Sequence, residues 1–433
     1  MNRCKIVLMQ THFFFRHIGA PPHPALSPKL GERGRVRGLN RKGLNAFVLV
    51  VCFLCSVCLS CATPRGTPGA PDDIQASQRP DLSSDEAGLW MYMDQIESRL
   101  KSSGRVVNDP ALNAYVRQIV CNIDPVHCSD IRIYIVDTPN FNASMAPNGC
   151  MQVWTGLILR ANNEAQLAYV LGHEMAHYLR RHTLQQWRTV RNTSSVLAFF
   201  SLATAAAGVG FAGDLAQLVA IGAIFAYSRD EEREADLIGF EMMAHAGYEP
   251  VQASAIWGDL LAEEEASGES AKSIFFATHP TTAERIATLR ELADKTAKTR
   301  TSWTEGREEY LNAIKPFRAA WLRAEVQKGN PKGSMVLLNR LLKEQKDSAE
   351  VHFFLGELYR LRGEKEDCDN ACAEYQKAVQ LGDPPPEIYR SMGVVYLRMG
   401  SAEEARRAFE EYLKVNPDAS DRQIIESYIN RLR

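Results

Sequence analysis

Hydrophobic and polar residues follow two different periods along this chain. Apolar side chains recur every three or four residues in several segments, a spacing that places them on one face of an α-helix. Three such segments come early, at 83–104, 109–123 and 162–187. The segment DIRIYIVDT at 130–138 instead alternates and is rich in β-branched residues, which predicts a strand. An Asn-Gly pair at 148–149 predicts a turn into a further strand around Met151–Leu157.

Helix start signals support these assignments. Ser, Asp and Glu residues precede the first helical segment, and Asn162 or Asn163 can cap the third. Two more helical segments follow at 228–250 and 274–292. The pattern therefore predicts an α+β, mainly helical domain.

The last third of the chain repeats itself. The segment FFLGELYRLRG at 353–363 aligns with RSMGVVYLRMG at 390–400, with an offset of 37 residues. The aligned pairs are Gly356 with Gly393, Tyr359 with Tyr396, and Gly363 with Gly400. This pattern resembles a tetratricopeptide (TPR) array, so we expect an all-α TPR solenoid over residues 301–433. Stacked helix pairs leave a concave face for peptide, whereas the alternative is a helical stalk that binds nothing.

The N-terminal region has the features of an export signal. A basic segment at 33–45 precedes an apolar run at 46–59, which is short for a membrane span. Leu59-Ser60-Cys61 resembles a bacterial lipoprotein cleavage site, which makes Cys61 the lipidated residue; the alternative is an uncleaved signal anchor. We assign residues 1–61 to an upstream extension followed by a signal peptide, and residues 62–80 to a flexible linker.

A second apolar stretch runs from Ser195 to Tyr227. A Gly-rich break with Asp214 divides it into halves that are each too short to span a bilayer as a helix. We expect a buried or membrane-touching helical hairpin, and a transmembrane element is the alternative.

Composition narrows the function classes. The formal net charge of the 433 residues is −2, so no bulk electrostatic argument favours a nucleic acid partner. Five cysteines lie after Cys61, at 121, 128, 150, 368 and 372. An oxidising compartment permits disulfides, and Cys121–Cys128 and Cys368–Cys372 are two candidate pairs that spacing alone does not establish.

The segment LGHEMAHYLRRH at 171–182 holds two histidines four residues apart. On a helix, residues i and i+4 share one face at about 5–6 Å, so His173 and His177 can bind one Zn²⁺ at about 2.0–2.1 Å. Glu174 is turned away from the metal and can act as a general base toward water. The alternative is that both histidines merely fill a helix face. The spacing and residue types favour a site for one zinc ion per chain.

A catalytic zinc site needs a third protein ligand, and no third histidine follows at short spacing. The helix predicted at 228–246 offers Glu232 and Asp236 on one face. Glu232 could reach the metal, and Asp236 could accept the second ring N–H of a ligating histidine. We expect Glu231 and Glu234 to lie on the solvated surface of that helix.

Small residues on both helices support a close approach. Gly172 and Ala176 lie on the first helix, and Ala235 and Gly239 lie on the second, at matching i,i+4 spacing. Without large side chains between them, the two helices can bring Glu232 toward the histidines.

The chain from Asp85 to Leu292 resembles the HtpX-, BepA- and Oma-like family of gluzincin zinc metallopeptidases. The resemblance rests on GHEMAHYLRRH, on SRDEEREADLIG with AGY after it, and on NASMAPNGCMQVWTGLI before both. It implies a zincin-like metallopeptidase domain over residues 81–300. The family's Ser-Arg-x-x-Glu-x-x-Ala-Asp motif places its metal ligand on Glu232 and its supporting acid on Asp236.

The family branch with a downstream repeat array is periplasmic and linked to outer-membrane protein quality control. The resemblance therefore implies an exported zinc endopeptidase that cleaves unfolded or misassembled envelope proteins. It also implies protein partners for the repeats and a location at the outer membrane through a lipid anchor. Ser144 and Cys150 depart from the family's usual pattern in the edge-strand motif, which bears on substrate contacts.

Other residues near these motifs have candidate roles. The resemblance implies that the His279-Pro280 loop lies over the zinc, with His279 as a regulatory fourth ligand; the alternative is a helix-capping turn. We read His182 as structural, because it points elsewhere on a continuous helix. Weak candidates for an oxyanion donor are His245, Tyr248 and Arg285. We expect the strand around Met151–Leu157 to pair with an extended substrate.

Two other functions compete with the endopeptidase. One is a chaperone or adaptor with an inactive or latent peptidase domain, against which the intact Glu174 and three candidate ligands argue. The other is a zinc amidase acting on cell-wall peptide, which no feature of the sequence supports.

Overall fold

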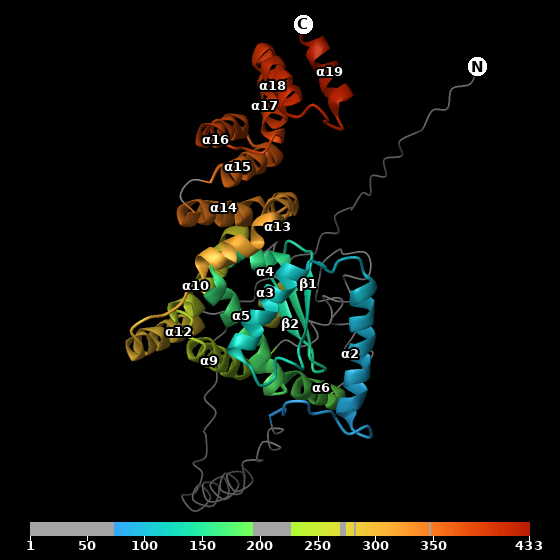
Figure 1. Ribbon diagram of the computed structural model, residues 1–433, viewed down its shortest axis with the longest axis vertical. Helices are drawn as coiled ribbons and strands as arrows, with labels where there is room; N and C mark the ends of the chain where they lie inside the picture. The colour runs from blue at the N-terminus through green and yellow to red at the C-terminus, as the bar shows by residue number, and fades with distance from the viewer. Residues whose placement is uncertain (1–72, 194–226, 269–273, 281–282, 346–347) are drawn as a thin grey trace, which may run out of the picture. The chain divides into compact units, whose positions relative to one another are not determined.

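The computed structural model describes residues 73–193, 227–268, 274–280, 283–345 and 348–433 (Figure 1). Helices dominate these residues, and one three-stranded sheet accompanies them. The predicted extension and signal peptide, Cys61, most of the 62–80 linker and the apolar stretch up to residue 226 lie outside the described residues. Among the helices that the structure describes, none combines the length and apolar character that crossing a membrane requires.

The sheet has the order β1-β3-β2. β1 (Arg132–Val136) pairs in parallel with β3 (Cys150–Trp154), and β2 (Ala143–Met145) pairs antiparallel with β3. The prediction of a substrate-pairing strand at Met151–Leu157 is wrong in two respects. The strand ends at Trp154, where α4 (Thr155–Arg160) begins, and it is the central strand with partners on both sides. The strands at the edges are β1 and β2.

Helices cover both faces of the sheet. Successive side chains of β3 point to opposite faces, and those on each face pack against helices. Cys150 and Trp154 point to one face and pack with α2 (Asp85–Ser102). Met151 and Val153 point to the other, where α3 (Pro110–Ile123) and α5 (Glu164–Leu179) lie (Figure 1).

The helix that carries the paired histidines is shorter than predicted. The side chain of Asn163 caps its start by accepting from the backbone N–H of Gln166, as one of the two expected caps. The helix α5 ends at Leu179, Arg181 adopts a left-handed φ of 55°, and α6 (His182–Thr193) begins at once. The single helix predicted over 162–187 is therefore two helices with a sharp change of direction between them.

Helices α5 and α9 (Arg229–His245) pack closely through their small residues. A Cβ atom added to Gly239 would lie 2.6 Å from the backbone nitrogen of His173. A Cβ atom on Gly172 would lie 3.2 Å from the carbonyl oxygen of Gly239. The predicted close approach of these two helices is confirmed.

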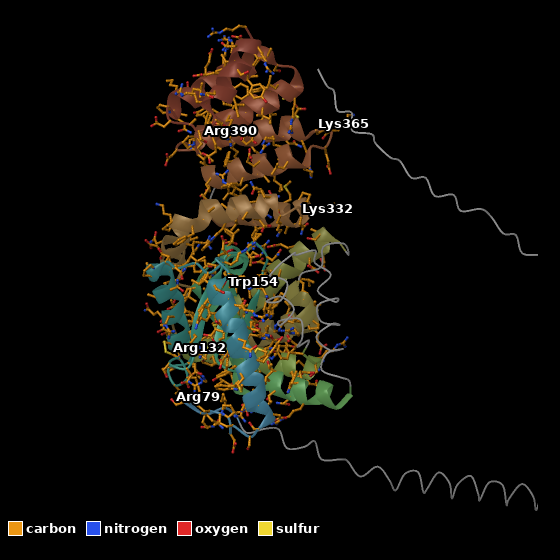
Figure 2. The ribbon with its side chains drawn as sticks, turned by 90° about the vertical axis from the view of Figure 1, so that its right-hand side faces the viewer. Arg79, Arg132, Trp154, Lys332, Lys365 and Arg390 are labelled. Carbon is orange, nitrogen blue, oxygen red and sulfur yellow. A yellow bond between two sulfur atoms is a disulfide. The ribbon has the colours of Figure 1, made fainter. Side chains whose placement is uncertain are left out.

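The remaining elements are helical. They are α10 (Val251–Ser267), α11 (Ile274–Thr278), α12 (Ala283–Thr296), a 3-10 turn at Ala297–Thr299, α13 (Arg307–Gln327), α14 (Pro331–Gln345), α15 (Ala349–Arg362), α16 (Asp367–Leu381), α17 (Glu387–Met399), α18 (Ala402–Val415) and α19 (Arg422–Arg431). Figure 2 shows Arg132 and Trp154 in the part that holds the sheet, and Lys332, Lys365 and Arg390 among the later helices.

The repeated segments form equivalent helix pairs. α15 packs on α16, and α17 packs on α18. Each aligned glycine packs against an aromatic ring of the second helix in its pair. Gly356 lies against the ring of Tyr375, and Gly393 lies against the ring of Phe409. The C-terminal region is thus helical, as expected, while its assignment as a TPR solenoid stays a prediction.

Buried charges connect α4 with the helices that follow the sheet. The guanidinium of Arg160 forms ion pairs with Glu263 of α10 at 2.7 Å and with Glu325 of α13 at 2.9 Å. All three side chains are buried. Opposite charges at this depth keep one another ionised, so α13 is joined to the sheet-bearing part by more than apolar contact.

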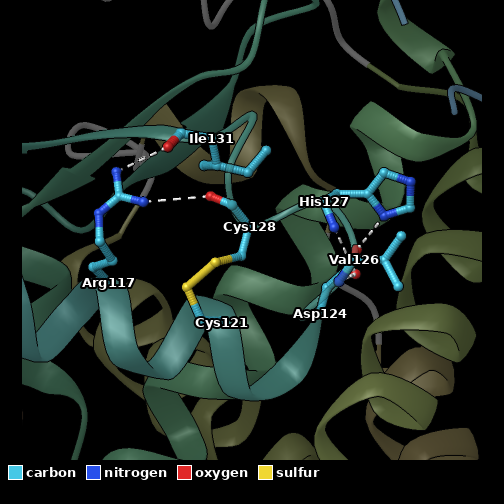
Figure 3. The surroundings of a disulfide bond; sticks show 7 residues. All are labelled: Arg117, Cys121, Asp124, Val126, His127, Cys128 and Ile131. Carbon is cyan, nitrogen blue, oxygen red and sulfur yellow. Dashed lines mark hydrogen bonds and ion pairs between the residues drawn. A yellow bond between two sulfur atoms is a disulfide. The ribbon is translucent and has the colours of Figure 1, made fainter. Parts of the chain in front are cut away.

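One of the two candidate disulfides is present. Cys121, near the end of α3, is bonded to Cys128 in the following loop (Figure 3). Arg117 donates to the carbonyl oxygens of Cys128 and Ile131, which holds the same loop against α3. Cys368 and Cys372 are free thiols. Both lie within α16, where the Cβ atoms of residues i and i+4 are about 5–6 Å apart, and a disulfide needs them at about 3.5–4.5 Å.

Candidate metal centre

The two histidines of α5 share a buried face of that helix. Their Nε2 atoms lie 3.2 Å apart, and neither side chain is exposed. Further metal ligands must come from other elements, because α5 carries only these two histidines.

Helix α9 supplies the carboxylates. Glu232 places Oε2 at 3.6 Å from the Nε2 atom of His173 and Oε1 at 3.4 Å from the Nε2 atom of His177. Asp236 lies one turn on, with Oδ1 at 3.1 Å from the other ring nitrogen of His173. The glycine contact between α5 and α9 sets these distances, because a larger residue at 239 would push the helices apart.

A third segment adds His279. Its Nδ1 atom lies 2.9 Å from Oε1 of Glu232 and 3.4 Å from the Nε2 atom of His173. The ring stacks on Phe275 with centroids 4.5 Å apart, and the backbone N–H of His279 donates to the carbonyl of Phe275. The structure therefore brings together His173, His177, Glu232 and His279, and one ligand atom from each lies within 4.8 Å of the others.

This donor set suits a divalent metal of the zinc type. Two imidazole nitrogens and a carboxylate oxygen are ordinary zinc ligands, and they converge here from two helices in a buried place. Burial lowers the pKa of His177 well below its ordinary value, so its ring is neutral and can offer a lone pair. Burial opposes ionisation of Glu232, but His279 and the hydrogen bonds to Glu232 outweigh it and lower the pKa of that carboxyl.

Glu174 lies beside the cluster without joining it. Its Oε1 atom is buried and has no hydrogen-bond partner among the described residues, and the Nε2 atom of His279 is 3.6 Å away. Burial raises the pKa of Glu174 above its ordinary value. A carboxylate with a raised pKa is a better proton acceptor near neutral pH, which suits a general base.

Asp236 sits in a network that the sequence analysis did not find. Arg285 donates to both of its oxygens, at 2.6 and 2.7 Å, and Tyr169 donates to Oδ1 at 2.7 Å. Trp257 donates in turn to the hydroxyl of Tyr169 at 3.0 Å. These groups hold the carboxylate next to His173. Their residues lie on four different helices, so no local pattern could reveal them.

His182 and Glu234 lie closer to the site than predicted. The Nδ1 atom of His182 is 2.8 Å from the Nδ1 atom of His177, and its Nε2 atom is 3.1 Å from Glu234. His182 is buried, and Glu234 also pairs with Arg180. The side chain of Glu234 is 37% exposed, so it lies at the surface as expected, but there it pairs with Arg180 and His182. Glu231 does lie at a helix end, where it forms a capping box with Ser228.

The structure supports none of the three candidate oxyanion donors, because one lies outside the buried cluster and the other two are engaged elsewhere. His245 is exposed at the end of α9, and the hydroxyl of Tyr248 donates to Glu164. Arg285 is engaged with Asp236 and Glu232.

Tyr227, which no sequence motif indicated, stacks on the ring of His177 with centroids 3.7 Å apart.

Residues 106–293 match the model of peptidase family M48. Over these residues the chain is similar to that family. The chain is 31% identical over 182 residues to the mitochondrial metalloendopeptidase OMA1 of Schizosaccharomyces pombe, across 41% of this chain and 52% of that protein. It is 30% identical over 229 residues to the mitochondrial metalloendopeptidase OMA1 of Bos taurus, across 51% of this chain and 43% of that protein.

The chain is also similar to a bacterial protein. The chain is 24% identical over 219 residues to the beta-barrel assembly-enhancing protease of Escherichia coli K12, across 48% of this chain and 44% of that protein. The expected resemblance to Oma- and BepA-like gluzincin peptidases is confirmed. The chain spans about half the length of the curated relatives it matches. Helix α2 and the helices from α13 onward lie outside the M48 match.

Proposed function

We propose that the protein is a zinc-dependent endopeptidase with His173, His177 and Glu232 as metal ligands and Glu174 as general base. One observation carries this proposal: two imidazoles and a carboxylate from separate helices converge on one buried point, with a second carboxylate beside it. When bound there, zinc supplies Lewis-acid chemistry, which polarises a carbonyl group and acidifies water.

The chain's own residues have distinct roles in this proposal. Glu174 takes a proton from the attacking water and passes it to the leaving amine nitrogen of the cleaved peptide bond. Asp236, held by Arg285 and Tyr169, fixes the orientation and tautomer of His173. His182 does the same for His177.

His279 makes the described arrangement a latent one. Its ring sits among the proposed ligands, 2.9 Å from Glu232, so it can fill the metal's fourth position. Water needs that position in a catalytic site, whereas closed sites have four protein ligands. Displacement of His279 by substrate would then switch on cleavage.

The substrate in this proposal is an extended chain. β2 lies at the sheet edge and packs on α5, which carries the proposed ligands. Backbone pairing with an edge strand suits unfolded segments, because folded proteins rarely expose one. The similarity to a beta-barrel assembly-enhancing protease supports unfolded or misassembled envelope proteins as substrates. The C-terminal helix pairs would recruit them or partner proteins, as TPR repeats do.

We also propose export to the periplasm and anchoring through a lipid on Cys61, with the outer membrane as the favoured location. The Cys121–Cys128 disulfide supports export, because such bonds persist in oxidising compartments.

The test is to measure zinc content and casein cleavage for the full chain and for Glu174→Gln. Zinc retained in both, with cleavage lost only in the variant, supports the proposal. Equal cleavage by both proteins contradicts it. Cleavage by neither, with binding of unfolded casein intact, would favour the chaperone or adaptor, a reading to which the central position of His279 lends some support.

A further inference from the structure

The outer edge of β2 lies next to a cavity. The second edge of β2 has no strand partner among the described residues. The cavity lies between the β2–β3 hairpin and α2, and its volume is about 430 Å³ including its open mouth. Met93, Ile96 and Leu100 of α2 line one side, and Ser144, Met145 and Cys150 of the hairpin line the other.

The walls of this cavity are mainly apolar. The charged group in its lining, Glu97, is occupied by Arg132 at 2.6 Å and by the hydroxyl of Tyr134 at 2.6 Å. Burial raises the pKa of the Cys150 thiol to about 12, so the sulfur stays protonated and behaves as a small apolar group. An uncharged, apolar group is therefore the occupant that such walls favour.

The cavity is separated from the metal centre by one layer of residues. Thr183 lines it and shares a hydrogen bond of 3.0 Å with the hydroxyl of Tyr227. The ring of Tyr227 stacks on His177. A side chain in the cavity would thus lie one layer of residues away from a proposed zinc ligand.

The geometry of a β-strand connects the free edge of β2 with the cavity. In a peptide that adds to β2, alternate side chains point to the two faces of the sheet. Ser144 and Cys150 mark the face that α2 covers, so every second side chain of the added strand points toward α2. The opposite face packs against α5.

We propose that the cavity between α2 and the β2–β3 hairpin is a specificity subsite, which binds one apolar side chain of a peptide strand paired with β2. The subsite rests on the proposed endopeptidase function. It makes α2 a determinant of cleavage preference, although α2 lies outside the M48 match. Leucine, methionine and phenylalanine are the side chains whose burial there would contribute most.

The test uses the zinc-loaded full chain and unfolded casein, with cleavage sites mapped by mass spectrometry. The wild-type protein should prefer Leu, Met or Phe at one fixed position near the cleaved bond. Ile96→Phe fills the cavity and should reduce cleavage at those sites by about tenfold relative to sites with Ala or Ser there, the scale of a poor fit in an apolar pocket. Met91→Phe adds the same ring on the exposed face of α2, where Met91 is 64% exposed, and should leave the preference unchanged.

The outcomes separate the two proposals. If the wild-type protein does not cleave casein, the endopeptidase proposal fails. If it cleaves and Ile96→Phe, folded and with zinc bound, shows the wild-type preference, only the subsite is overturned. Should Ile96→Phe not fold, Ile96→Ala enlarges the cavity and must shift the preference toward Trp and Phe. A preference that stays unchanged in that variant also overturns the subsite.

Discussion

The Nδ1 atom of His182 lies 2.8 Å from the Nδ1 atom of His177. If Nε2 of His177 binds the metal, its Nδ1 atom is protonated and donates to His182. The Nε2–H of His182 then donates to Glu234, so one consistent set of tautomers runs through the three residues. This chain orients a proposed ligand in the way that outer partners of metal-binding histidines usually do.

We expect His182→Ala to weaken zinc binding by about 10- to 100-fold, because His177 loses the partner that fixes its ring. Competition with a chromogenic chelator measures the affinity. His245→Ala is the matched control, since His245 is exposed and lies outside the cluster. Affinities that are equal in the two variants would show that His182 only fills space.

We expect Gly239→Ala to destabilise the protein by about 1–3 kcal/mol, the usual cost of overpacking. The added methyl would lie 2.6 Å from the backbone nitrogen of His173, so α5 and α9 must separate and zinc content should fall as well. Urea unfolding measures the stability. Gly258→Ala, where a Cβ atom meets nothing within 4 Å, should instead be neutral or stabilising. Equal stabilities for the two variants would contradict the close packing of α5 and α9.

We expect His279→Ala to raise basal casein cleavage severalfold, because it frees the metal position that His279 can fill. Initial rates of the purified, zinc-loaded proteins measure the effect. His127→Ala serves as a control, because His127 pairs with Asp124 in the disulfide loop (Figure 3). Unchanged or lower activity, with fold and zinc content intact, would rule out latency through His279.

We expect Glu97→Gln to lower the stability most at neutral pH. Burial alone would raise the pKa of Glu97, but hydrogen bonds from Arg132, Tyr134 and Lys101 lower it to about 2. A lowered pKa means that the carboxylate stabilises the fold above its unfolded-state pKa of 4.5, and that this contribution is lost as pH falls from there to about 2.

The measurement is urea unfolding of the wild-type protein and Glu97→Gln between pH 7 and pH 2. Both proteins are compared without zinc, because acid releases the metal. The difference in stability should shrink steadily below about pH 4.5. Glu291→Gln, whose ion pair with Lys295 is exposed, should show little difference at any pH. A difference for Glu97→Gln that does not depend on pH would refute the role of its charge.

Local patterns predicted the elements well and their connections poorly. Caps and apolar spacing indicated α2, α3, α5 and α9, and the small residues correctly predicted a close contact between α5 and α9. The break at Arg181 was missed, because a left-handed φ at a non-glycine residue leaves no signal in the local pattern. On a continuous helix, His182 would point about 140° away from His177. The break is what turns it back.

The order of the strands could not be predicted from local sequence patterns, for a different reason. β3 joins two partners that come before it in the chain, and such pairing depends on tertiary packing and not on residue type. The same limit applies to Glu234, which has the sequence context of a surface residue. Its two partners, Arg180 and His182, come from the region around the unforeseen break.

The bond between Cys121 and Cys128 reports whether a molecule has been in an oxidising or a reducing compartment. Material synthesised and kept in a reducing cytoplasm would carry two additional thiols, which a maleimide label and a mass difference of two hydrogens reveal. Intact mass measured on protein taken directly from cells would then report the compartment in which each molecule matured.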